Sequence, residues 1–398
     1  GLTAIDRDLT ENEFVEILNG VLSAIRCNHT NIVRSLSYEQ RPRRILPFEV
    51  HFEGDRCWSK RDYGLAPRVA HGTEILTIDG VPPAEARARI ARRYYPDGFN
   101  ASFQQAMSEA RFLLDYCELR GEPDSIRLRV RRETGEEEEF SQPTVAIWEF
   151  AKAQRKQTPL RINREFSCQI LDERSAVMSI PSFETMNREE IDQWFGELDA
   201  KRISNLILDL RNNSGGSLDN LRYFYSYFAR GPFQCPRYSL ANSDSSYSFF
   251  KDTDNRLPGS TMYGVWRPHA ESGGFRQDGP ISEPHETHHY NGQVYVLING
   301  RTLSAAAVCA GLLMRDNGAV LVGAETGGGY YLNSAEQWAN LMLKCAPLTI
   351  HFPLLQLVFA EEGHARIPRG RGVPPDYEVR GSLEDIRNNV DRQFEIGR

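Results

Sequence analysis

The sequence predicts an α/β layered fold. Two apolar runs, residues 203–210 and residues 293–299, have the length and composition of buried strands. Each is followed by a turn and by a run with helical spacing, residues 218–228 and residues 305–315, and residues 319–323 form another short apolar run. Because helices that alternate with strands cover the faces of a sheet, this order is typical of layered α/β domains.

Composition places the chain among ordinary globular proteins and excludes several functional classes. Its 398 residues, 40% of them hydrophobic and 25% charged, are enough for two or three domains with their own cores. The net charge of −7 argues against binding to a nucleic-acid backbone, which requires a basic face. The longest apolar run, residues 305–314, is too short to span a membrane. We therefore expect neither a nucleic-acid partner nor a membrane span.

Cysteine usage and the first residue bear on the cellular context. The seven cysteines are an odd number and include no Cys-x-x-Cys pair, which excludes a regular disulfide framework and the usual zinc-binding spacings. The chain begins at Gly1, with neither an initiator methionine nor a signal peptide. We expect a processed chain whose original targeting segment is missing, and we expect no cofactor.

Residues 1–45 are expected to form an N-terminal helical segment. Thr10 is a capping residue for a helix, and apolar residues over positions 14–25 recur at helical spacing. The helical pattern ends before Asn28 and His29, which follow in a polar turn. Taken alone, His29 is as consistent with a surface loop histidine as with a functional one.

Residues 46–145 are expected to form a second unit. Residues 72–81 alternate apolar and polar side chains and then turn at Asp79-Gly80, which is typical of a strand that ends in a tight turn. A helical insertion is predicted over residues 99–121.

Residues 146–398 are expected to form the largest unit. A strand is predicted over residues 176–180, and Asn187 caps the helix that follows it. Residues 234–284 are rich in Gly, Pro, Ser and Asn, and they are predicted to be a long, loop-dominated insertion. Residues 285–289 read H-E-x-x-H between a proline and a strand. No helix there can place both histidines on one face, so we expect no metal site.

Ser304 lies at the start of the predicted helix 305–315, where a serine has two functional advantages. The helix dipole favours negative charge at that end, and the first amides of a helix have no partner within it. Those amides can stabilise an oxyanion while the hydroxyl attacks a carbonyl group. The alternative is that Ser304 only caps the helix, which is the commoner role of serine there.

Three further motifs are spread over the largest unit. Residues 209–216 read D-x-R-x-N-x-G-G at the end of a strand. Ser304-Ala305 is followed by a helix and by G-x-x-T-x-G at residues 323–328, and residues 372–376 read G-V-x-P-D. Together they resemble the C-terminal processing (tail-specific) serine peptidases, a family that includes the tricorn core peptidase. The resemblance implies a crotonase-like (ClpP/crotonase) catalytic domain, with residues 46–145 as a degenerate PDZ-like domain.

The resemblance also implies roles for individual residues. In that family an N-terminal helix ends at a His-Thr dipeptide, matched by His29, and in the tricorn-like branch this histidine is the general base. The other branch uses a lysine whose position is occupied here by Gly329, so the Ser/His branch is favoured. Asn28 stands where the tricorn-like branch has a supporting serine. The candidates for its acidic residue are Glu361 and Glu362.

The expected chemistry is hydrolysis of a peptide bond through an acyl-enzyme on Ser304. His29 accepts the hydroxyl proton, and the amides of Ala305 and of Gly215 or Gly216 form the oxyanion hole. The expected partner is a peptide or protein substrate, and bacterial relatives suggest a location in the periplasm or outside the cell. The alternative is a catalytically weak or inactive relative that binds peptides or hydrophobic ligands on the same scaffold. The oligomeric state is left open.

Overall fold

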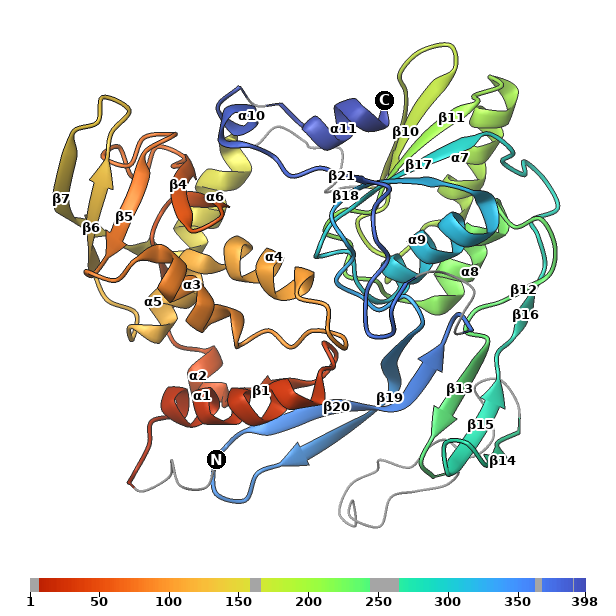
Figure 1. Ribbon diagram of the computed structural model, residues 1–398, viewed down its shortest axis with the longest axis horizontal. Helices are drawn as coiled ribbons and strands as arrows, with labels where there is room; N and C mark the ends of the chain where they lie inside the picture. The colour runs from red at the N-terminus through yellow and green to blue at the C-terminus, as the bar shows by residue number, and fades with distance from the viewer. Residues whose placement is uncertain (1–6, 158–165, 244–264, 362–366, 389) are drawn as a thin grey trace.

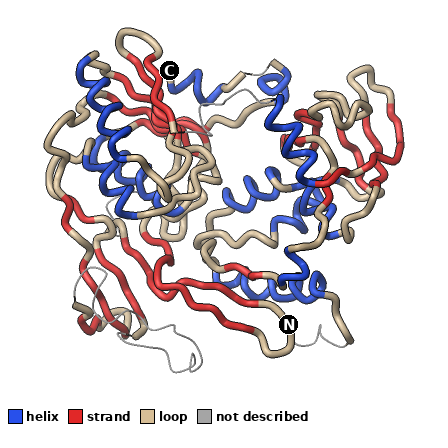
Figure 2. The backbone as a smooth tube through the Cα atoms, turned by 180° about the vertical axis from the view of Figure 1, so that it is seen from behind, coloured by secondary structure: helices blue, strands red, loops and turns tan. Residues whose placement is uncertain are grey.

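The protein consists of two bodies that lie side by side (Figure 1). The computed structural model describes residues 7–157, 166–243, 265–361, 367–388 and 390–398. A long hairpin, β19 (Leu332–Met342) and β20 (Thr349–Val358), runs beneath both bodies, and Figure 2 shows it from behind. On the opposite side, the C-terminal helices α10 (Leu383–Arg387) and α11 (Arg392–Gly397) lie between the bodies.

Six strands form the central sheet of the larger body. Their order in the sheet is β21-β18-β17-β11-β10-β9, and every neighbouring pair is parallel except β9 with β10. Their bounds are β9 (Ser167–Ile170), β10 (Ser175–Ser179), β11 (Asn205–Asp209), β17 (Gln293–Ile298), β18 (Val320–Gly323) and β21 (Tyr377–Glu378). The strands predicted at residues 203–210, 293–299 and 319–323 are thereby confirmed.

Helices cover both faces of this sheet. On one face lie α7 (Arg188–Ala200), which Asn187 caps as predicted, α8 (Leu218–Ser226) and α9 (Ser304–Asn317). Because side chains alternate between the faces of a strand, Leu206 and Leu208 pack in the core beneath these helices. Ile207 points to the other face, in a smaller core against which Phe394 of α11 packs. Within the described ranges, no helix is long and apolar enough to cross a membrane.

The smaller body has a hydrophobic core of its own. Its antiparallel sheet has the order β3-β4-β5-β6-β7. The strands are β3 (Glu49–Glu53), β4 (Arg56–Arg61), β5 (Glu74–Ile78), β6 (Ser125–Arg131) and β7 (Glu137–Pro143), and the helices are α3 (Pro83–Ala91), α4 (Ser102–Ala110) and α5 (Phe112–Leu119). The predicted strand that turns at Asp79-Gly80 is β5, and the predicted helical insertion is α4 and α5.

The N-terminal segment connects the two bodies. Helix α1 (Glu11–Leu22) starts at the predicted capping box, in which the Thr10 and Glu13 side chains accept each other's amides. A 3-10 turn, η2 (Ser23–Ile25), precedes β1 (Asn31–Val33), which pairs antiparallel with β20. The remaining elements of this region are α2 (Leu36–Glu39), β2 (Arg44–Ile45), β8 (Val145–Ala146) and α6 (Ile147–Gln157).

The structure corrects the prediction of a loop-dominated insertion over residues 234–284. Its described residues contain β13 (Tyr238–Ala241), β14 (Arg267–His269), β15 (Gly274–Asp278) and β16 (Ile281–Ser282), and β16 pairs with β12 (Phe233–Gln234). The prediction was wrong because these strands are short and depend on partners that local composition does not reveal. Strand β13 pairs with the distant β20, β15 and β14 extend that sheet, and β16 pairs with β12. Residues 244–264 lie outside the described part of the chain.

Residues 285–289, which read H-E-x-x-H, form a turn rather than a helix. Their histidines contact different parts of the larger body. The His285 ring stacks on Tyr227, with ring centroids 4.0 Å apart, while His288 Nδ1 lies 3.1 Å from the Asp199 carboxylate.

The core beneath α7 and α8 is sensitive to loss of a single aromatic side chain. Phe195 is 1% exposed and stacks on Tyr227 at a centroid distance of 4.0 Å. We predict that Phe195→Ala lowers the free energy of unfolding by about 3–5 kcal/mol, because it removes buried surface and leaves a cavity. Urea denaturation followed by circular dichroism measures the change. Trp148→Ala, which truncates an aromatic side chain that is 64% exposed, is the matched control, and an equal effect of both variants would contradict the prediction.

Candidate active site

Ser304 begins α9 in a strained backbone conformation. Its φ angle is 45°, in the left-handed region that residues other than glycine and asparagine rarely adopt. Such a conformation costs roughly 1–3 kcal/mol and persists only where the surroundings impose it. The alternative that Ser304 merely caps the helix is wrong, because the cap position belongs to Leu303 and no side chain caps this end.

Hydrogen bonds from the end of β11 hold the turn that precedes Ser304. The Leu303 amide donates to the Asn213 carbonyl at 2.9 Å, and the Thr302 hydroxyl donates to the Leu210 carbonyl at 2.9 Å. Since β11 and β17 are parallel neighbours, the turns at their carboxyl ends meet at one edge of the sheet. The position of Ser304 is therefore fixed by a second turn far from it in sequence.

Gly215 packs directly against Ser304. A Cβ atom at Gly215 would lie 2.6 Å from the Ser304 Cβ atom and 2.8 Å from the Ala305 amide nitrogen. A Cβ atom at Gly216 would lie 2.1 Å from the Glu184 amide nitrogen. The φ angles of the two glycines, 99° and 131°, also favour glycine. Neither position accepts a side chain without displacement of its neighbours.

The backbone amides around Ser304 differ in whether they already donate a hydrogen bond. The Gly215 amide donates to the Asn213 side chain at 2.8 Å, so it is already occupied. Within the described ranges, the amides of Ala305 and Gly216 have no hydrogen-bond partner. These two amides are free to donate to a bound group.

His29 is half-buried in the turn between η2 and β1. Burial lowers the pKa of its imidazole to about 4. Its Nδ1 atom is buried and has no hydrogen-bond partner among the described residues. On one side the ring lies against Trp338 of β19, with ring centroids 5.9 Å apart. The imidazole is therefore neutral near neutral pH.

Asp97 is a buried neighbour of His29 that the sequence analysis missed. Its Oδ1 atom accepts the Asn28 backbone amide at 2.9 Å, and a Cβ atom at Gly329 would lie 4.0 Å from the Asp97 Cβ atom. Burial raises the pKa of Asp97 to about 7. One ligand-type atom from each of Cys27, His29 and Asp97 lies within 4.8 Å of the others. The sequence around Asp97 carries no signal beyond that of a turn.

Asp97 also links the His29 turn to the surroundings of Ser304. Gly329, which packs against Asp97, follows Gly328 in the chain, and a Cβ atom at Gly328 would lie 2.8 Å from the Ser304 amide nitrogen. The segment 327–329 therefore touches the Ser304 turn and the aspartate beside His29. Residues almost three hundred positions apart in sequence meet at this segment.

The structure does not bring Glu361 to Ser304. Glu361 forms an ion pair with Arg237 and lines a cavity of about 700 Å³ that Arg315 and Asp316 also line. Arg315 lies in the last turn of α9, roughly 16 Å along the helix from Ser304 at 1.5 Å per residue. Glu362 lies outside the described residues.

The remaining motif residues hold the scaffold together. Arg211 pairs with Asp209 and with Asp391 of the C-terminal segment, at 2.7 and 2.8 Å. The Thr326 hydroxyl accepts the Val373 amide at 2.8 Å, which ties the second motif to the third. These contacts give a structural role to the motif residues that do not touch Ser304.

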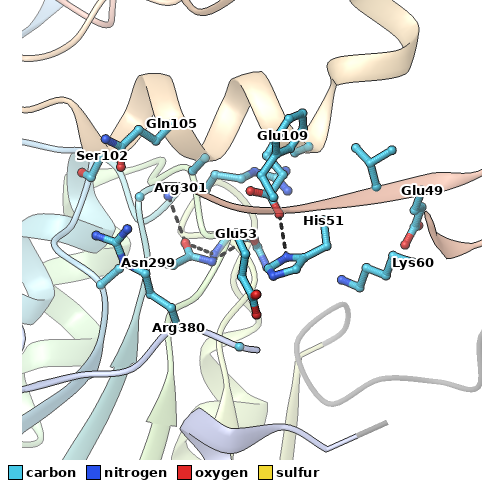
Figure 3. Close-up of a pocket in the computed structure, with 18 of the residues that line it drawn as sticks. Glu49, His51, Glu53, Lys60, Ser102, Gln105, Glu109, Asn299, Arg301 and Arg380 are labelled. Atoms are coloured by element: carbon cyan, nitrogen blue, oxygen red, sulfur yellow. Dashed lines mark hydrogen bonds and ion pairs between the residues drawn. The ribbon is translucent and has the colours of Figure 1, made fainter. Parts of the chain in front are cut away.

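A cavity of about 1180 Å³ lies between the two bodies. Figure 3 shows acidic and basic side chains of both bodies around it, among them Glu53, Glu109, Arg301 and Arg380. Neither Ser304 nor His29 lines this cavity, but residues 299–301, which do, directly precede the Ser304 turn.

Comparison with solved structures identifies the fold. The structure of mature CPAF complexed with lactacystin superposes with a TM-score of 0.67 at 14% identity, covering 96% of this chain and 87% of that chain. A crystal structure of mature CPAF gives a TM-score of 0.64 at 16% identity, covering 94% and 84%. A CPAF mutant gives 0.69 at 14% identity, covering 100% and 90%. At these identities the likeness establishes the fold alone. No curated protein matches the sequence significantly.

Comparison of the sequence with known families gives one match. Residues 174–379, which are more than half of the chain, match peptidase family S41. The matched segment contains the Ser304 turn, the glycine pair and the third motif. The chain therefore belongs to peptidase family S41 and is a serine-type peptidase.

Proposed function

We propose that the protein hydrolyses peptide bonds through an acyl-enzyme on Ser304, with His29 as the general base. The observation that carries this proposal is the strained Ser304 at the start of α9, pressed against Gly215. Strain of this kind is typical of residues whose position matters for chemistry. The hydroxyl attacks the substrate carbonyl carbon as its proton passes to His29, and water then releases the acyl group with His29 acting again.

The choice of base favours the Ser/His branch. The position of the lysine used in the other branch is Gly329, which packs against Asp97. The next lysine in the chain, Lys344, is exposed in the turn between β19 and β20. The His29 imidazole is neutral near neutral pH, so one ring nitrogen has an electron pair that can accept a proton, which supports its role as the base.

The oxyanion hole is assigned to the amides of Ala305 and Gly216. Both are without a partner within the described ranges, whereas Asn213 occupies the Gly215 amide. Backbone donors held in place before the reaction stabilise developing negative charge at no cost of reorganisation. Gly215 then serves to let the two turns approach closely.

Asp97 is proposed as the positioning residue for the base, a role that the sequence alone directed to Glu361 or Glu362. It holds the amide of Asn28, next to His29, and its second oxygen is buried and without a partner among the described residues. A carboxylate in this place orients the imidazole and stabilises the imidazolium that forms during the reaction. Asn28 supports the site through its backbone rather than through the amide group of its side chain.

The domain-level predictions are retained as parts of this proposal. We assign residues 1–45 to the base-carrying segment, 46–145 to a PDZ-like domain and 146–398 to a crotonase-like catalytic domain. The separate core of the smaller body and the parallel sheet with helices on both faces support these assignments. The substrate is a peptide or protein, part of which occupies the cavity between the bodies. The location is the periplasm or the exterior of the cell.

Reaction with a fluorophosphonate probe tests the proposed nucleophile. We predict that the wild-type chain is labelled at Ser304, that Ser304→Ala removes the label, and that His29→Gln slows labelling by about 100-fold or more because the hydroxyl loses its base. Intact-mass spectrometry with peptide mapping measures the adduct. Ser272→Ala, which alters an exposed serine in a distant turn, is the control. A wild-type chain that stays unlabelled yet binds peptides or apolar ligands would establish the non-catalytic alternative instead.

The contact between the two turns is tested at Asn213. Its side chain donates to the Ile180 carbonyl at 2.7 Å and accepts the Gly215 amide, so Asn213→Ala releases Gly215 from its place beside Ser304. We predict a loss of about 100-fold in kcat with little change in KM, because misplacement of catalytic groups by about 1 Å has effects of this size. Steady-state kinetics on a peptide substrate measures both constants. Ser214→Ala, which alters the exposed neighbour, should leave both constants near wild type, and equal losses in the two variants would refute the role of Asn213.

A further inference from the structure

We propose that Cys27, His29 and Asp97 form a binding site for Zn²⁺, and that the bound ion switches the peptidase off by engaging its general base. The inhibitory part rests on the proposed role of His29. The binding part rests only on the geometry of the three side chains and the unpaired atoms around them.

The donor atoms fit zinc in chemistry and in spacing. A thiol sulfur, an imidazole nitrogen and a carboxylate oxygen lie within 4.8 Å of one another. These are the three ligand types that Zn²⁺ takes, at bond lengths of about 2.0–2.3 Å, whereas Mg²⁺ and Ca²⁺ prefer oxygen ligands alone. Around a tetrahedral ion the ligand atoms lie about 3.5 Å apart. Side-chain movements of about 1 Å bring the three atoms to that spacing.

Two of the three ligand residues, and the neighbouring Asn28, carry unpaired buried atoms. His29 Nδ1, Asp97 Oδ2 and Asn28 Nδ2 are all buried without a hydrogen-bond partner among the described residues. Buried polar atoms are nearly always paired in native proteins, so unpaired atoms on two ligand residues and on Asn28, which lies between two of them in the chain, indicate that a bound species supplies the contacts. A zinc ion with one water molecule satisfies this requirement. The metal takes the imidazole nitrogen and the carboxylate oxygen, and the Asn28 amide group donates to the water.

The surroundings also orient the ligands. The Asn28 backbone amide donates to Asp97 Oδ1, so Oδ2 is the oxygen that remains to bind the metal. This hydrogen bond also fixes the orientation of the carboxylate. Hydrogen bonds of this type to the second atom of a ligand raise metal affinity. Binding converts the Cys27 thiol to a zinc thiolate and releases its proton to solvent, so the charge and the atoms balance without any oxidant.

Inhibition follows from the electron pair that the metal uses. An imidazole whose nitrogen is bonded to Zn²⁺ holds that electron pair in the bond and is tied to the metal in one orientation. It then no longer accepts the Ser304 proton, and the hydroxyl is left without its base. Removal of the ion by a chelator restores the free imidazole, so the inhibition is reversible.

Zinc titration of the full chain, first freed of metal with a chelator, tests the proposal. Calorimetry should show one tight site per chain, and Cys27→Ala and Asp97→Asn should each weaken it by about 100-fold or more. Cys345→Ala, which removes an exposed thiol elsewhere, should leave the zinc affinity unchanged. Cobalt(II) in place of zinc should give a thiolate-to-metal charge-transfer band that Cys27→Ala removes. If circular dichroism shows that the Cys27→Ala variant has not folded, Cys27→Ser replaces it in these measurements.

Activity is then followed against zinc concentration, relative to the zinc-free rate of each variant. The inhibition constant should rise in parallel with the dissociation constant in the Cys27 variant. An affinity that Cys27→Ala leaves unchanged, or zinc binding at this site that leaves peptidase activity intact, overturns the proposal. An inactive chain that still binds zinc through Cys27 would refute the proposed peptidase mechanism while supporting the metal site.

Discussion

The close contact between two turns at the edge of the parallel sheet determines the conformation of Ser304. One turn follows β11 and carries the glycine pair, and the other follows β17 and leads into α9. The Leu303 amide is hydrogen-bonded to the Asn213 carbonyl, and the backbone of Gly215 packs against the Ser304 Cβ atom. The strained backbone conformation of Ser304 persists because the core beneath α9 is almost entirely buried and close-packed, so it cannot move to relieve the strain.

Local sequence signals were sufficient for the elements that build this contact. The apolar runs of β11 and β17, the Asn187 cap and the glycine at the end of α9 each act within a few residues, so their effects are visible in the sequence. The motif at residues 209–216 likewise describes a single turn whose glycines are required by close approach. What these signals share is that the interacting groups are neighbours along the chain.

Long-range pairing could not be predicted in the same way. In the insertion, β13 pairs with the distant β20 and β15 pairs with β13, and Asp97 lies beside His29 only because the N-terminal turn folds over it. A lone aspartate before a glycine resembles an ordinary turn residue. Glu361, one of the two glutamates proposed as the acid, illustrates the same limit. Glu361 lies beside the far end of α9, and sequence separation does not give the position of a side chain in space.

The cluster of Cys27, His29 and Asp97 connects the proposed catalysis with the proposed control by zinc. The β1–β20 pairing and the Asp97 carboxylate place its imidazole, so the proposed base belongs to the N-terminal segment while the proposed nucleophile belongs to the larger body. A crystal structure of the protein with a peptide boronate would reveal how these parts meet. We expect a tetrahedral adduct on Ser304 whose oxygen lies about 2.7–3.1 Å from the Ala305 and Gly216 amide nitrogens, with a His29 ring nitrogen about 3 Å from Ser304 Oγ. A boronate bound elsewhere, or a His29 ring that remains out of reach of the adduct, would contradict the mechanism.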